Sequence, residues 1–147
     1  MIEVYTDGSC LGNPGTGGWA FQIFNEGTII NHFGYQLDTT NNQMELTAAI
    51  KALEFLQKES EIILFTDSTY LRNGITSWIV NWKKNNWKNS QRKDVKNKIL
   101  WEKLDVLNSR KNITWKWVKA HDINEHNNKV DLLAREAAEN LIKSSFD

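Results

Sequence analysis

The sequence predicts an α/β protein with a five-stranded mixed sheet, made of an antiparallel meander plus parallel strands and flanked by helices. Three observations support this fold class. Residues 2–36 contain three apolar stretches separated by short turn-forming segments, which is typical of a meander. Residues 62–66 and 113–118 form two later apolar stretches, and segments with helical periodicity lie before and after them. The predicted order of elements is therefore βββαβα…βα.

The meander is predicted to consist of strands at Ile2–Ser9, Trp19–Phe24 and around Ile29–Gln36. A glycine-dense segment, Gly12–Gly18, joins the first two strands. We interpret it as a hairpin connection, because another strand pattern follows at once. Its glycine spacing is wrong for a dinucleotide-binding fingerprint, and no helix follows it.

A helix is predicted after the meander. Thr39–Asn42 supplies the capping side chains that favour a helix start. Apolar residues then recur at helical spacing, which places Glu45 in the first turn of this helix. The residues at this spacing are Met44, Ala48, Ala49, Ala52, Leu53, Phe55 and Leu56.

Four further elements complete the predicted fold. Ile62–Thr66 is nearly all apolar, as expected of a central strand covered on both faces. Helical segments are predicted from Ser68 to about Asn108. Ile113–Val118 alternates apolar and polar residues and is the fifth strand, and a closing helix runs from about Asn127 to Lys143.

Length and composition indicate one globular domain covering residues 1–147. Hydrophobic residues make up 40% and charged residues 24%, which is ordinary for such a domain. No apolar stretch is long enough to span a membrane, and the first residues form a predicted strand rather than an export signal. The single cysteine, Cys10, excludes an internal disulfide and fits a reducing compartment. We therefore expect a cytoplasmic protein.

The charge is unevenly distributed. The segment from residue 81 to residue 98 holds seven basic residues and one acidic residue, a net charge of +6, whereas the whole chain has a net charge of +0. One interpretation is a solvated, lysine-rich helix face. The other is a protruding basic element that binds nucleic acid, because Trp78, Trp82 and Trp87 alternate with the charges and offer stacking surfaces. The basic residues are Lys83, Lys84, Lys88, Arg92, Lys93, Lys96 and Lys98.

Acidic residues lie where a metal site is expected. Asp7 and Asp67 each follow an apolar strand and a threonine, and each precedes Gly or Ser. Open α/β sheets bind ligands at such strand ends, and Mg²⁺ prefers oxygen ligands. Glu45 and Asp131 are further candidates. Alternatively, the aspartates are turn or capping residues and Glu45 only complements the helix dipole.

Four segments together resemble bacterial type 1 ribonuclease H. They read YTDGSCLGNPGTGG, TTNNQMELTAAIKAL, LFTDSTYLRNGITSWIVNWKKNNW and WKWVKAH followed by VDLLA, and they cover essentially the whole chain in order. The resemblance implies a ribonuclease H-like fold. It also implies a metal-dependent endonuclease that hydrolyses the RNA strand of RNA/DNA hybrids and leaves 5′-phosphate and 3′-hydroxyl ends.

The resemblance implies specific catalytic roles. The family's four carboxylates correspond to Asp7, Glu45, Asp67 and Asp131, and its mobile histidine to His121. These carboxylates are expected to hold two Mg²⁺ ions with substrate bound, with Mn²⁺ as a substitute. Asp7 would bridge both ions, and His121 would transfer protons near neutral pH.

Substrate contacts are implied in the same way. The residues that correspond to contacts with the RNA strand are Cys10, Asn13, Asn41 and Asn42. Those that correspond to a pocket for a DNA phosphate are Thr40 and Asn97. Those that correspond to the DNA channel and the basic protrusion are Trp78, Trp82, Lys83, Lys84 and Lys88. The chain departs from its relatives at Asp38, where a relative has arginine, and at Thr69, where glutamine is common. Ala120, Asp122 and Asn128 are further departures near His121 and Asp131.

Two alternatives to a ribonuclease H stay open at this point. The first is another nuclease or a strand-transfer enzyme on the same fold, which the basic segment and the Thr-Asn-Asn helix start disfavour. The second is a catalytically silent hybrid-binding module, which predicts the loss of at least one metal carboxylate. None of the four is missing. We expect a monomer that binds RNA/DNA hybrid duplexes and no membrane.

Overall fold

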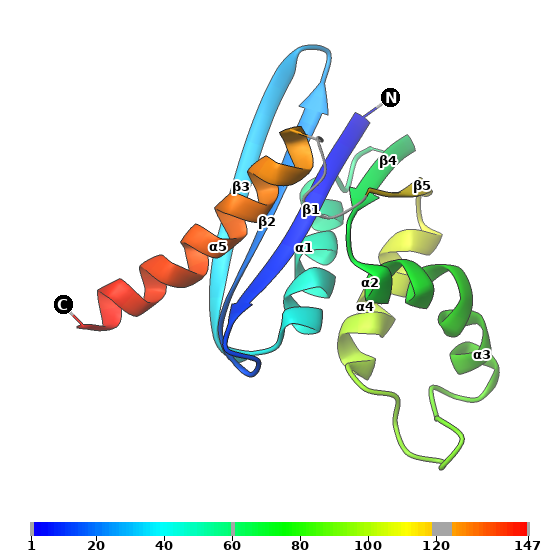
Figure 1. Cartoon of the computed structure of the whole chain (residues 1–147). Coiled ribbons are helices and arrows are strands. Elements are labelled where there is room, and N and C mark those ends of the chain that lie inside the picture. Colours follow the sequence, from blue (N-terminus) through cyan, green and yellow to red (C-terminus); the bar gives the residue numbers. More distant parts are fainter. Residues whose placement is uncertain (1, 60, 119–124, 147) are drawn as a thin grey trace.

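The computed structural model describes residues 2–59, 61–118 and 125–146. Its sheet has the strand order β3-β2-β1-β4-β5 (Figure 1). Strands β1 (Ile2–Leu11), β2 (Gly15–Asn25) and β3 (Thr28–Thr39) form the antiparallel meander, while β4 (Glu61–Thr66) and β5 (Asn112–Trp117) run parallel to β1. The predicted five-stranded mixed sheet is confirmed.

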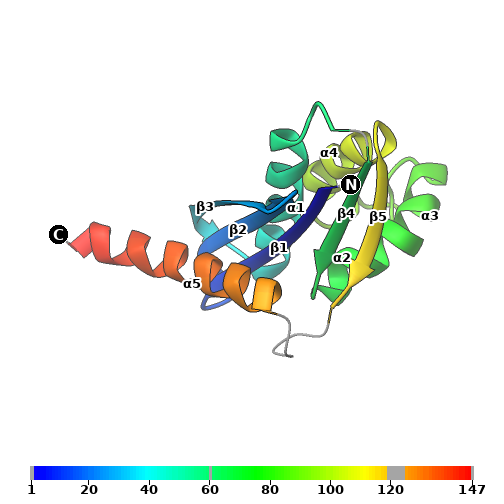
Figure 2. The same ribbon diagram turned by 90° about the horizontal axis from the view of Figure 1, so that it is seen from above.

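Helices cover both faces of this sheet. Helix α5 (Glu125–Phe146) crosses one face over β1 and β2, whereas α1 (Asn41–Phe55) and α4 (Lys98–Ser109) lie on the other (Figure 2). Alternation along β1 supplies both layers, because Val4 packs into the larger core with α1 and Tyr5 packs against α5. None of the described helices is long and apolar enough to cross a membrane.

Helix α1 begins as predicted, but Glu45 lies deeper in it than expected. Thr40 is the N-cap, and its Oγ1 accepts a hydrogen bond from the backbone N–H of Gln43 at 3.2 Å. The first turn therefore comprises Asn41, Asn42 and Gln43 and holds no acidic residue. Placing Glu45 in the first turn was wrong, and complementing the helix dipole, which acts within that turn, does not explain it.

The region from Ser68 to Asn108 is less helical than predicted. Helix α2 (Thr69–Asn73), a π-helical turn η1 (Gly74–Trp78) and α3 (Ile79–Lys84) follow one another. Residues 85–97 then form turns rather than helix and project from the body of the molecule (Figure 1). The asparagine-rich sequence explains the difference, because Asn86 adopts a left-handed backbone and Asn89 Oδ1 accepts backbone N–H groups within the turn.

The glycine-dense segment is mostly strand. Only residues 12–14 form the turn, and β2 already begins at Gly15. Gly18 allows α5 to approach β2 closely, because a Cβ at this position would lie 2.1 Å from the carbonyl oxygen of Ala134. The glycines in this segment therefore serve strand and helix packing as well as the turn.

Gly18→Ala is expected to destabilise the protein by about 1–3 kcal/mol, because the added methyl overpacks the contact between β2 and α5. Urea unfolding followed by circular dichroism measures the change. Gln36→Ala on the neighbouring strand β3 is the control, because Gln36 is exposed. Equal unfolding midpoints for the glycine variant and the wild type would show that α5 can move away from β2 without cost.

Candidate active site

Asp7 and Asp67 reach the site from neighbouring strands. Tyr5 of β1 pairs with Phe65 of β4 in parallel register, so each aspartate lies two residues beyond this pair. Strand β4 ends at Thr66, where the chain turns toward α2, while β1 continues beside β2. The two carboxylates therefore meet where the parallel strands separate. The Thr-Asp pattern predicted both at strand ends, which is right for Asp67, whereas Asp7 lies within β1 because its pairing with β2 extends to Leu11.

Glu45 joins them because β1 and α1 are in contact at a glycine. A Cβ on Gly8 would lie 2.3 Å from the carbonyl carbon of Met44 and 2.4 Å from the backbone nitrogen of Glu45. Only glycine permits this approach without displacing the helix. The contact at Gly8 is what brings the Glu45 side chain beside Asp7.

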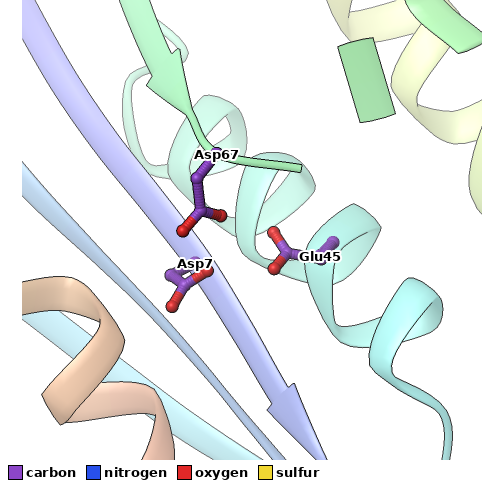
Figure 3. A group of neighbouring side chains, drawn as sticks. All are labelled: Asp7, Glu45 and Asp67. Carbon is purple, nitrogen blue, oxygen red and sulfur yellow. The ribbon is translucent and has the colours of Figure 1, made fainter. Parts of the chain in front are cut away.

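These three carboxylates converge. One oxygen atom from each lies within 4.8 Å of the others, and Figure 3 shows the side chains of Asp7, Glu45 and Asp67 pointing toward one another. Asp7 and Glu45 are buried, with 2% and 4% of their surface exposed. Glu45 Oε2 is buried and has no hydrogen-bond partner among the described residues. A buried oxygen of this kind is costly unless a ligand satisfies it.

The environment opposes negative charge in the absence of a cation. Burial, followed by the neighbouring Glu45 and Asp67 carboxylates, raises the pKa of Asp7. Burial is also the main cause that raises the pKa of Glu45. Within the described part of the chain, no ion pair includes any of the three carboxylates. An all-oxygen donor set without a countercharge fits a hard divalent cation.

Asp131 lies at the margin of this cluster. A hydrogen bond with Asp131 contributes to the raised pKa of Asp7, so the two side chains are adjacent. Its Oδ2 is 3.3 Å from Nε of Arg135, one turn further along α5, and its side chain is 22% exposed. Asp131 is therefore better solvated than the buried Asp7 and Glu45 and already has a cationic partner.

Asn127, which no sequence pattern singled out, also belongs to the site. Asn127 is buried on α5, and its Nδ2 donates a hydrogen bond to Asp67 Oδ2 at 3.3 Å. Trp117 Nε1 donates to the backbone oxygen of Asp67 at 3.2 Å. The available signal was spacing, because Asn127 precedes Asp131 by four residues and shares its helix face. His121, by contrast, lies outside the described residues.

The residues matched to RNA contacts gather at one corner, where the β1–β2 turn meets the start of α1. Asn13 Oδ1 accepts a hydrogen bond from the backbone N–H of Asn41 at 3.0 Å. The Cys10 thiol donates to the backbone oxygen of Thr39 at 3.3 Å, and burial raises the pKa of this thiol. Asn42 follows in the first turn of α1.

Gln43, which no sequence pattern singled out, connects Thr40 with Asn97. Gln43 donates its backbone N–H to Thr40 Oγ1 and its side-chain Nε2 to Asn97 Oδ1, at 3.2 and 3.1 Å. Gln43 lies between the capping Thr40 and Glu45 in sequence. No local sequence pattern predicts its contact with Asn97, because the two residues are far apart in the chain.

The tryptophans and lysines form a separate surface. Trp78 and Trp82 have ring centroids 5.9 Å apart, and Trp78 is 37% exposed. Lys83 pairs with Asp105 at 3.3 Å, and Lys88 pairs with Asp94. Lys84 has no ion pair within the described ranges and lines an open cleft of about 840 Å³. The cleft is lined by Asn81, Trp82, Lys84, Asn85, Asn86, Lys88, Asn89, Ser90 and Arg92.

The mixed sheet and the carboxylate cluster at its strands are compatible with a metal-dependent enzyme. A family model described as RNase H matches residues 1–139. The curated Ribonuclease H of Francisella tularensis subsp. novicida (strain U112) is 51% identical over 141 residues, which is 96% of this chain and 93% of that protein. The chain therefore belongs to the ribonuclease H family.

Solved structures agree with this family. LC9-RNase H1, described as a type 1 RNase H with the type 2 active-site motif, is similar with a TM-score of 0.84 and 27% identity. The similarity covers 95% of this chain and 72% of that one. LC11-RNase H1 in complex with an RNA/DNA hybrid has a TM-score of 0.71 and 27% identity, over 97% of this chain and 99% of that one.

The metal-free protein is expected to lose stability as the pH rises from about 5 to about 8. The pKa values of Asp7 and Glu45 are raised in the folded state, so the folded protein holds protons that the unfolded chain releases near pH 4. The free energy of unfolding therefore falls with pH, by at most about 1.4 kcal/mol per pH unit for each extra proton. Asp7→Asn should flatten this dependence and raise the melting temperature at the upper pH.

Thermal unfolding in the presence of a chelator, measured at both pH values, checks this expectation. Glu54→Gln is the control, because Glu54 is exposed on the same helix as Glu45. Identical pH dependence in the wild type and Asp7→Asn would mean that Asp7 is ionised in the metal-free fold.

Proposed function

We propose that the protein is an endonuclease that hydrolyses the RNA strand of RNA/DNA hybrids and leaves 5′-phosphate and 3′-hydroxyl ends. The observation that carries the proposal is the convergence of Asp7, Glu45 and Asp67, of which the first two are buried and Glu45 has an oxygen without a hydrogen-bond partner among the described residues. Membership of the ribonuclease H family and the similarity to LC11-RNase H1, whose structure was solved with an RNA/DNA hybrid, support the choice of substrate.

In this proposal Asp7, Glu45, Asp67 and Asp131 hold two Mg²⁺ ions when substrate is bound, and Mn²⁺ can replace them. Such ions lower the pKa of an attacking water and stabilise the charge on the phosphate and leaving oxygens. The chain itself orients the ligands. Asn127 holds the Asp67 carboxylate, and Arg135 balances the charge of Asp131. His121 is proposed to transfer protons.

The corner of Cys10, Asn13, Asn41 and Asn42 is proposed to bind the RNA strand. The 2′-hydroxyl distinguishes RNA from DNA, and this corner carries the amide side chains of Asn13, Asn41 and Asn42 at the start of the helix that holds Glu45. In this proposal the protein distinguishes RNA from DNA beside the carboxylates, through contacts with the strand that is cut.

The other strand is proposed to lie across two further surfaces. Thr40 and Asn97 bind one of its phosphates, and Trp78 and Trp82 contact its sugars and bases. Exposed tryptophan beside lysine suits this role, because aromatic rings stack on bases while ammonium groups neutralise phosphates. Lys83, Lys84 and Lys88 complete the surface; Lys84 is the best placed, because ion pairs already occupy the other two.

A catalytically silent hybrid-binding module is the second candidate, and the presence of all four carboxylates disfavours it. The same carboxylates would also serve a strand-transfer enzyme, which the substrate experiment below separates. The monomeric state, the single domain over residues 1–147 and the cytoplasmic location stay predictions.

Asp7→Asn and Asp67→Asn should each abolish cleavage while leaving the fold intact, because they remove a ligand and keep its volume. The loss should be about 10³-fold or more, since metal stabilisation of the transition state is worth several kcal/mol. End-labelled RNA·DNA, RNA·RNA and DNA·DNA duplexes, incubated with and without Mg²⁺, provide the measurement. Only the RNA strand of the hybrid should be cut, and only with the metal.

Two additions make this experiment decisive. Glu54→Gln should cut like the wild type, because Glu54 is exposed and outside the cluster. A hybrid whose RNA strand carries a deoxy patch around the cut site should resist cleavage inside the patch. Wild-type turnover by either aspartate variant contradicts the metal assignment, and cutting inside the patch contradicts recognition through the 2′-hydroxyl.

Lys84→Gln should weaken hybrid binding and flatten the slope of log affinity against log salt by about 0.9, the value for one phosphate contact. Lys103→Gln is the matched control, because Lys103 is an exposed lysine on α4 that does not line the cleft. Binding is measured by fluorescence anisotropy in a chelator at several salt concentrations. Equal slopes for the wild type and Lys84→Gln would remove Lys84 from the interface.

A further inference from the structure

A chain of side-chain hydrogen bonds connects the start of α1 with the start of α4. Thr39 Oγ1 donates to Gln43 Oε1 at 2.9 Å, and Gln43 Nε2 donates to Asn97 Oδ1 at 3.1 Å. Asn97 Nδ2 donates to the hydroxyl oxygen of Tyr70 at 3.1 Å, and Trp101 Nε1 donates to the same oxygen at 3.0 Å. Five residues from β3, α1, α2 and the beginning of α4 are thus connected in one line.

One end of this chain is fixed in the core. Trp101 is fully buried, and Gly74 lies so close that a Cβ there would be 1.9 Å from Cη2 of the indole ring. Tyr70 packs between Trp101 and Trp78, with ring centroids at 5.4 and 5.6 Å. The Tyr70 hydroxyl therefore has a defined position from which to hold Asn97.

The orientation of the Asn97 side chain depends on its neighbours, because no hydrogen bond to the backbone of its own helix fixes it. It adopts the left-handed conformation, with φ of 60°, and its side chain makes no capping bond to α4. A free carboxamide here could rotate to exchange its oxygen and nitrogen. Gln43 and Tyr70 determine which way it points, because one contacts the oxygen and the other contacts the nitrogen.

The arrangement leaves donors for a ligand. Each carboxamide nitrogen carries two hydrogens, and the contacts of Gln43 Nε2 and Asn97 Nδ2 within the described part of the chain use one hydrogen each. Both residues line a surface cleft of about 470 Å³. Gln43 is also two residues from Glu45 on the same helix, so the distance between this cleft and the carboxylates is set by one rigid turn.

We infer that Gln43 and Tyr70 are positioning residues that orient the Asn97 carboxamide and set the offset between the phosphate bound there and the phosphate that is cut. The inference rests on the proposed function, in which Asn97 contacts the uncut strand. If the carboxamide is free to rotate, the phosphate loses a defined donor, and the hybrid can shift along the protein before cleavage.

The test uses hybrids in which one linkage of the DNA strand is a neutral methylphosphonate, moved stepwise along the strand. For the wild type, the methylphosphonate should raise KM at only one position relative to the cut, because there it removes the phosphate charge that Asn97 contacts. Gln43→Leu and Tyr70→Phe should lose this position dependence. On the unmodified hybrid their KM should rise about 3- to 10-fold, the effect of one lost hydrogen bond, with a smaller change in kcat and cuts spread to neighbouring positions.

Matched controls are Gln57→Leu and Tyr35→Phe, since both residues are exposed and outside the hydrogen-bond chain. Wild-type KM and an unchanged sensitive position in both Gln43→Leu and Tyr70→Phe would overturn the inference. A lower melting temperature and lower kcat with unchanged KM would also overturn it, because the chain would then be structural only. Failure of the wild type to cut any hybrid would instead refute the proposed function.

Discussion

The close approach of β1 and α1 at Gly8 is the constraint on which the active site depends. It places the backbone of Glu45 against a strand that already carries Asp7, so two buried carboxylates lie side by side, and no ion pair among the described residues neutralises them. Burial is the main cause that raises the pKa values of both, and the neighbouring carboxylates of Glu45 at Asp7 and of Asp67 at Glu45 raise them further. The fold thus holds in place an arrangement that is unfavourable by itself and becomes favourable when a cation enters.

The residues around the cluster hold its carboxylates to different degrees. Asn127 and Trp117 hold Asp67 by its carboxylate and its backbone oxygen, so its direction does not depend on a metal. Asp131, in contrast, shares its charge with Arg135 and is partly solvated. The four carboxylates therefore differ in how firmly they are oriented before any cation binds.

The basic segment is distant from the carboxylates in sequence, but side-chain contacts connect it to the helix that carries Glu45. Residues 85–97 project as a loop, yet Asn97 at its end is joined through Gln43 to the helix of Glu45 and through Tyr70 to the tryptophan cluster. Lys88 and Asp94 form a bridge across the loop, and Lys88 lowers the pKa of the Asp94 carboxyl. Because these contacts hold the charged loop in place, its basic side chains lie at a defined distance from the carboxylates.

Local patterns in the sequence determined the meander, the start of α1 at its threonine cap and the strand end that carries Asp67, because periodicity and capping depend on near neighbours. The same patterns ended the first strand too early, since Asp7 lies within β1. They failed where turn chemistry outweighed helical periodicity, in residues 85–97, and at the exact turn that holds Glu45. Only the tertiary structure decided the contact of Gly8 with α1, the bond from Asn127 to Asp67 and the chain from Gln43 to Tyr70. Each of these joins residues far apart in sequence, so it depends on how the helices pack against the sheet.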